Sequence, residues 1–176
     1  DTLKFSDSAW VEVLPSKQFD VNTQYQKVID ISEEFAETVK KAASIYESLK
    51  QMQYNLNKVA QMQFDNDKFG DSIKKRGSQL ILSIDSLKDR FMLPEGYRYY
   101  EESTLRLMDV LGEAGGLIRG SIELNQNTRN AVDNARKMTD LIADEVREFI
   151  RFKYQSFMGE VESNKQWDWK KEIDKF

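Results

Sequence analysis

The chain has 176 residues, of which 40% are hydrophobic and 32% are charged, with only 8 Gly and 2 Pro. This composition excludes collagen-like chains and Pro/Gly-rich disordered chains. The formal net charge is −4, which disfavours nucleic-acid binding through a large basic surface. His and Cys are absent, so disulfides, Cys/His zinc sites and Ser-His-Asp triads are excluded. The composition indicates a globular helical domain and does not by itself identify a function.

Residues 1–21 differ in pattern from the rest of the sequence. Residues 9–14 (AWVEVL) are rich in β-branched side chains and roughly alternate, and Pro15 ends the run, which predicts one short strand. Nothing later in the sequence resembles a second strand with which it could pair. We therefore expect residues 1–21 to be a strand and linker from a preceding domain. The start at Asp1, without Met or an apolar leader, favours a processed chain or part of a longer one.

Four segments with apolar residues at steps of three and four predict amphipathic helices at about residues 22–62, 67–92, 99–122 and 129–162. The first would be roughly 60 Å long at 1.5 Å per residue. Short breaks separate the segments, and Thr128 is expected to cap the last helix. The predicted fold is all-α: a four-helix antiparallel bundle with a long first helix, preceded by one short strand. The bundle spans residues 22–162, and a tail follows over 163–176.

The same spacing predicts which side chains face the core. In the first helix these include Val28, Ile31, Phe35, Val39, Ala42, Leu49, Met52, Leu56 and Val59, and in the third they include Leu105, Met108, Leu111, Gly115 and Ile118. In the last helix they are Val132, Ala135, Met138 or Thr139, Ile142, Val146, Phe149 or Ile150, the aliphatic stem of Lys153, and Phe157.

Two acidic clusters are candidates for metal sites. Glu33, Glu34 and Glu37 lie within one helical turn, as do Asp140, Asp144, Glu145 and Glu148. Helical bundles build di-iron centres from inward Glu and His side chains, but these carboxylates lie off the apolar stripe and no His is available. We expect them to pair with Lys and Arg neighbours, with no metal and no cofactor.

The third predicted helix contains four glycines, at 112, 115, 116 and 120. Each costs about 1 kcal/mol relative to Ala in a helix interior. No strand precedes them and no Gly-Lys-Ser/Thr follows, so they do not form a phosphate loop. Close helix–helix approach, or a kink, is the favoured interpretation, and ligand binding is the alternative.

Five aromatic residues are the candidate partner-binding residues. Tyr97, Tyr99 and Tyr100 follow the turn at residues 93–96, and Trp167 and Trp169 lie in the tail. The tyrosines could instead cap one end of the core with their hydroxyls in water. The tryptophans resemble an interfacial membrane anchor, but acidic neighbours cancel the basic charge, so we expect docking on protein and no membrane contact.

The order of elements resembles a known family. The residues AWVEVLP at 9–15, Phe19-Asp20-Val21 and the helix entry Tyr25-Gln26 resemble the junction at the end of bacterial, Bacteroidetes-type sortilin-like BNR-repeat β-propeller proteins, often labelled glycosyl-hydrolase-like. Gly120-Ser121-Ile122, before residues 125–128, lies where that family has a small-residue break between its last two helices. The resemblance implies an exported protein, periplasmic or at the cell surface. It also implies a C-terminal helical region without catalytic residues, because the family's site region lies in the propeller.

Together these features predict a non-catalytic helical accessory module of a larger exported protein, acting as a spacer and docking surface. Its partner would be another protein or the preceding domain of the same polypeptide, and nucleic acid is not expected. The alternative is a stand-alone helical bundle that binds a protein partner or a small ligand in the cell envelope. An enzyme that uses carboxylates, Tyr or Lys is the least favoured interpretation.

Overall fold

The computed structural model describes residues 21–62, 64, 67–92, 105–121 and 123–164. These residues are helical almost throughout, which confirms the all-α class. Within these ranges there is no strand, and the strand predicted at residues 9–14 lies outside them. None of the described helices is long and apolar enough to cross a membrane.

The helices follow the predicted order with shifted boundaries. They are α1 (Val21–Ala60), α2 (Asp67–Lys88), α3 (Leu107–Gly120), α4 (Gln126–Phe149) and α5 (Gln155–Asn164), with a π-helical turn, Ile150–Tyr154, between α4 and α5. The predicted fourth helix therefore comprises α4, the π-helical turn and α5. Asn125, and not Thr128, caps α4, because the Asn125 side chain accepts a hydrogen bond of 2.9 Å from the Thr128 N–H.

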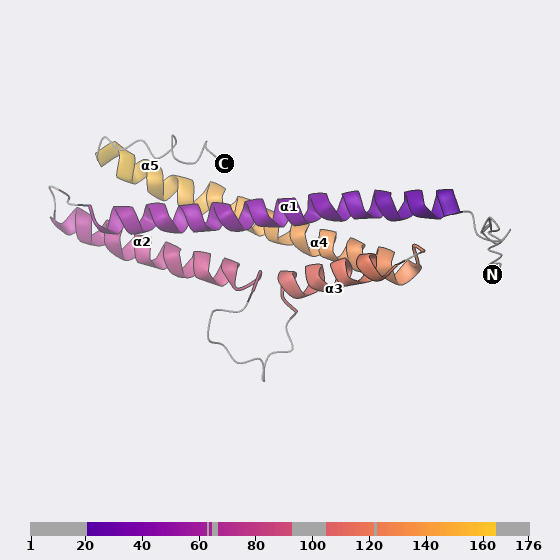
Figure 1. Ribbon diagram of the computed structural model, residues 1–176. Coiled ribbons are helices and arrows are strands. Elements are labelled where there is room, and N and C mark those ends of the chain that lie inside the picture. Colours follow the sequence, from indigo (N-terminus) through magenta and orange to yellow (C-terminus); the bar gives the residue numbers. More distant parts are fainter. Residues whose placement is uncertain (1–20, 63, 65–66, 93–104, 122, 165–176) are drawn as a thin grey trace, which may run out of the picture.

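The long helix α1 contacts α2, α3 and α4 (Figure 1). α2 packs along its C-terminal half and α3 along its N-terminal half. α4 packs on α3 and α1 and crosses α1 in this view, so that α5 lies near the α2 end of the molecule. α2 has 22 residues and α3 has 14, so at 1.5 Å per residue they measure about 33 Å and 21 Å and together nearly match the 40 residues of α1. Helices that follow one another in the sequence pack together, α1 with α2 and α3 with α4. The predicted four-helix antiparallel bundle is not confirmed, because α2 and α3 lie one after the other on the same side of α1.

Backbone hydrogen bonds join the end of α2 to the start of α3. The Leu107 N–H donates to the Arg90 carbonyl and the Met108 N–H to the Phe91 carbonyl, each at 3.0 Å. The Arg106 guanidinium also donates to the Asp89 carbonyl at 2.6 Å. These bonds hold the facing ends of α2 and α3 together, although twelve residues, 93–104, lie outside the described ranges between them.

A continuous apolar core runs between the helices. Its fully buried members include Leu49, Leu56, Ile73, Ile84, Leu107, Val132, Ile142 and Phe157, which agrees with most of the predicted stripe. Four predicted positions differ: Val39 is 40% exposed, Leu105 is 66% exposed, Met108 is 49% exposed, and Lys153 is exposed on the surface.

The π-helical turn explains the error at Lys153. A π-turn adds one residue to the helical repeat, so the inward position after Phe149 falls on Tyr154, which is only 1% exposed. Tyr154 Oη accepts a hydrogen bond of 3.2 Å from the side-chain amide of Asn55, which is fully buried in α1. Gln51 donates to the Asn55 Oδ1 at 3.2 Å. A buried polar pair thus connects α1 to the turn where the register of the last helix shifts.

Candidate functional site

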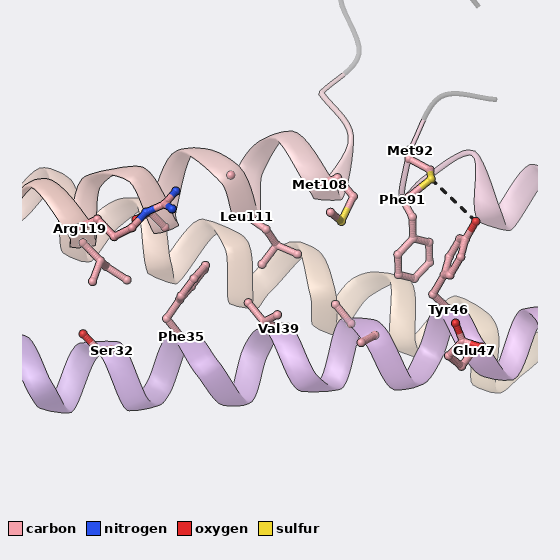
Figure 2. A pocket seen from close by; sticks show the side chains of 15 residues that line it. Ser32, Phe35, Val39, Tyr46, Glu47, Phe91, Met92, Met108, Leu111 and Arg119 are labelled. Carbon is pink, nitrogen blue, oxygen red and sulfur yellow. Dashed lines mark hydrogen bonds between the residues drawn. The ribbon is translucent and has the colours of Figure 1, made fainter. Parts of the chain in front are cut away.

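The five predicted partner-binding residues, Tyr97, Tyr99, Tyr100, Trp167 and Trp169, lie outside the described ranges. Their role stays a prediction. The described residues form a different candidate site, an apolar groove of about 580 Å³ between α1, α3 and the end of α2 (Figure 2). Its lining residues are Ser32, Phe35, Val39, Ala42, Ala43, Tyr46, Glu47, Phe91, Met92, Met108, Leu111, Gly112, Gly115, Ile118 and Arg119.

One wall of the groove is a face of α1. Phe35, Val39 and Tyr46 project from this face toward α3 and the end of α2 (Figure 2). Their spacing of four and seven residues places them on one side of the helix. The groove extends from Ser32 to Glu47, which is about 22 Å along α1 at 1.5 Å per residue. The groove therefore runs along roughly four turns of α1.

The opposite wall is a face of α3. A hydrogen bond stabilises the first turn of this helix: the Arg106 backbone N–H donates to the Asp109 carboxylate at 3.2 Å. Met108 and Leu111 line the groove near this start, and Ile118 lines it near the other end. α4 passes behind both walls (Figure 2) and packs on α1 and α3, so it closes the far side. The groove opens on the side away from α4.

Aromatic and sulfur-containing side chains gather at the α2 end of the groove. The rings of Tyr46 and Phe91 are 5.4 Å apart between centroids, at an interplanar angle of 58°. Tyr46 Oη lies 3.9 Å from the Met92 sulfur. Met92 and Met108 are 42% and 49% exposed, so two unbranched, polarizable side chains form the rim. Such side chains adapt their shape to a bound apolar surface.

Glycines widen the α3 wall. A Cβ at Gly115 would lie 3.4 Å from the Phe35 ring, so close packing, the favoured interpretation, holds at this position. It is wrong at Gly112, Gly116 and Gly120, where a Cβ would have no neighbouring atom within 4 Å. Gly112 lines the groove, whereas Gly116 does not. Gly112 thus leaves open space in the groove, and it is not needed for a close contact between helices.

Replacing Gly112 or Gly116 by Ala should stabilise the protein. Each Cβ enters open space, and each change removes a helix-interior Gly that costs about 1 kcal/mol relative to Ala. We expect each variant to raise the free energy of unfolding by up to about 1 kcal/mol, measured by urea denaturation. Gly70→Ala is the contrasting control, because its Cβ would lie 3.1 Å from the Phe64 Cβ, and this crowding should make the gain smaller than at Gly112 and Gly116. A loss of stability in both α3 variants would contradict the open environment.

The two charged residues of the groove lie at opposite ends (Figure 2). Glu47 is paired with Lys50 at 2.8 Å. The hydrogen bond from Lys50 to the Glu47 carboxylate, together with the charge of that carboxylate, raises the pKa of Lys50. Arg119 donates through Nε to the Gly115 carbonyl at 3.2 Å. In the described part of the chain no carboxylate lies within ion-pair distance of Arg119, so the uncompensated charge of the groove is positive and lies at the Arg119 end.

The acidic clusters considered as metal sites are divided among ion pairs. Arg136 pairs with Glu34 of α1, Lys41 pairs with Asp140 at 2.7 Å, and Arg90 pairs with Glu145 at 2.8 Å. These three pairs connect different helices, whereas Glu37 pairs with Lys40 and Asp144 pairs with Arg147 one turn along the same helix, so the expected pairing with Lys and Arg neighbours is found both within and between helices. Across the residues that the structure describes, no group of three or more acidic side chains is placed to hold a metal ion.

The groove was not predicted from the sequence, because its walls carry the same kinds of apolar residue as the buried core. Phe35, Val39, Met108 and Leu111 follow the same spacing as the buried residues, and periodicity alone does not tell a core face from an open one. The available signal was the run of glycines in α3 beside two methionines. That combination is unusual for a tightly packed helix, because Gly weakens the helix and Met specifies packing poorly.

Comparison of the chain with family models, curated proteins and solved structures finds no match. The resemblance to the sortilin-like propeller proteins therefore stays an expectation from the sequence.

Proposed function

We propose that this chain is a non-catalytic helical interaction module of a larger exported protein, and that the groove between α1 and α3 binds an apolar part of a protein partner. The observation that carries the proposal is the groove itself. Two helix faces that carry core-type side chains meet there, and among the described residues no further helix lines the groove. Apolar surface left open in this way commonly marks a protein–protein interaction site.

The composition of the groove supports binding over catalysis. Its lining is almost entirely apolar, with aromatic rings and methionines at one end. Such residues are enriched at the buried centres of interfaces, where a few of them supply most of the binding energy. The location in an exported protein rests on the sequence resemblance, and so does the role as a C-terminal accessory region.

A matched pair of variants tests this function. Gly112→Leu places a side chain in the groove, and Gly116→Leu places the same side chain on α3 outside it, both in open space. Immobilised variants would be incubated with an extract of the source organism, and the retained proteins compared by quantitative mass spectrometry. We expect at least one protein to be retained by the native chain and by Gly116→Leu but lost, by about tenfold or more, from Gly112→Leu. Identical retention by the two variants would contradict a binding role for the groove.

A further inference from the structure

We infer that the occupant of the groove is an amphipathic α-helix of the partner, with an acidic side chain in its first turn placed against Arg119. This inference rests on the proposed function and specifies the chemistry of the partner. The geometry supports a helix, because α1 and α3 form two walls and α4 closes the far side. A fourth helix laid in the groove would complete a four-helix cross-section, in which apolar faces meet at a common core.

The dimensions fit a helix of ordinary length. The groove follows α1 for about 22 Å, which is the length of about 15 helical residues. The exposed rim residues Val39, Met92 and Met108 would contact such a helix along its flanks. Gly112 provides the space for a large side chain, because apart from its own stretch of helix no atom of the described residues lies within 4 Å of its Cβ position. Apolar residues of the partner at i, i+4, i+7 and i+11 would follow the length of the groove.

The charge of the groove sets the polarity of the partner. Only the Nε–H of Arg119 has a partner within the described residues, the Gly115 carbonyl, and a guanidinium has five donors. At the other end Glu47 is already neutralised by Lys50. A carboxylate on the partner is therefore favoured at the Arg119 end. In a helix, Asp and Glu are favoured in the first turn, so the partner helix would begin beside Arg119 and run parallel to α1.

Three synthetic peptides test this inference. Each has about 18 residues, blocked termini and Leu at the four groove-facing positions, and they differ only in a first-turn residue, which is Glu, Gln or Lys. Their affinities for the full chain would be measured by fluorescence anisotropy. We expect the Glu peptide to bind about two- to fivefold more tightly than the Gln peptide, the range of an exposed ion pair, and the Lys peptide to bind least. High salt should reduce the difference between them.

Three protein variants identify the contacts. In Arg119→Gln the Glu and Gln peptides should bind equally. Gly112→Leu should weaken all three peptides by about tenfold or more, whereas the control Gly116→Leu should leave them unchanged. Circular dichroism of each variant would show that the helices are retained.

Each other outcome overturns a defined part of the inference. Equal affinity of the Glu and Gln peptides for the native chain would overturn the acidic contact. If none of the peptides binds while the extract experiment still separates Gly112→Leu from Gly116→Leu, the helical occupant is wrong and the binding function stands. Peptide binding that Gly112→Leu does not weaken would overturn both the occupant and the groove. If sedimentation shows a dimer of the native chain that Gly112→Leu abolishes, the occupant is a second copy of this chain.

Discussion

Replacing Leu49 by Ala is expected to lower the free energy of unfolding by roughly 2–5 kcal/mol. Leu49 lies in the C-terminal half of α1, is fully buried, and belongs to the core shared by the helices around it. Removing its side chain loses apolar burial and leaves a cavity that the packed helices fill only in part. Chemical denaturation with urea, followed by circular dichroism at 222 nm, measures the change.

Leu82→Ala is the matched control, because it removes the same atoms from a side chain that is 69% exposed. We expect that variant to stay within about 0.5 kcal/mol of the native chain, as is usual for surface positions. Similar losses at Leu49 and Leu82 would show that the core does not run along α1 as described. Ile142→Ala, on the opposing helix α4, should behave like Leu49→Ala, since Ile142 is also fully buried.

Tyr154→Phe should lower the free energy of unfolding by about 1–3 kcal/mol, although it removes a single oxygen atom. That oxygen accepts the hydrogen bond from the Asn55 amide, and Asn55 is fully buried. Without the Tyr154 oxygen, the Asn55 amide N–H loses this acceptor at a buried position. A buried donor that lacks this bond lowers the stability of the folded state by its desolvation free energy. Thermal and urea denaturation both measure the effect, and Tyr54→Phe, at a tyrosine that is 51% exposed, is the control with little expected change.

A double variant separates the hydrogen bond from the packing of the ring. Replacing both partners, with Asn55→Leu and Tyr154→Phe together, removes the unpaired polar group and keeps similar side-chain volume. We expect the double variant to recover part of the stability lost in Tyr154→Phe, because an apolar pair of matching shape has no buried donor to satisfy. A double variant less stable than Tyr154→Phe alone would mean that losing the hydrogen bond from Gln51 to Asn55 outweighs the removal of the unsatisfied amide.

The fold could be predicted from the sequence to the level of its helices, and the reasons differ by element. The spacing of Ile31, Leu49, Leu56 and Val59 identifies α1, because a helix has one strong period. The π-helical turn could not be predicted in this way, since Ile150–Tyr154 carries no residue that marks an added position. It shifts the inward residue from Lys153 to Tyr154, and only the contact with Asn55 reveals the change.

The spacing of apolar residues does not predict how the helices are arranged around one another. The amphipathic faces of α2 and α3 indicate that each packs on something, but not that both pack on the same side of α1. The groove exists because α1 and α3 leave part of their facing sides uncovered, so Phe35 and Val39 look like core residues in the sequence. The candidate site therefore arises from how the helices are placed, and not from a local motif.

The hydrogen bonds between the end of α2 and the start of α3 have a consequence for how the chain tolerates changes in length. Because Leu107 and Met108 bond directly to Arg90 and Phe91, the two helices are aligned by their own backbones. The entropy cost of bringing two such ends together grows only slowly with the number of residues that join them along the chain. We therefore expect the register of α2 against α3 to be kept in variants that have a few more or fewer residues between Met92 and Leu105.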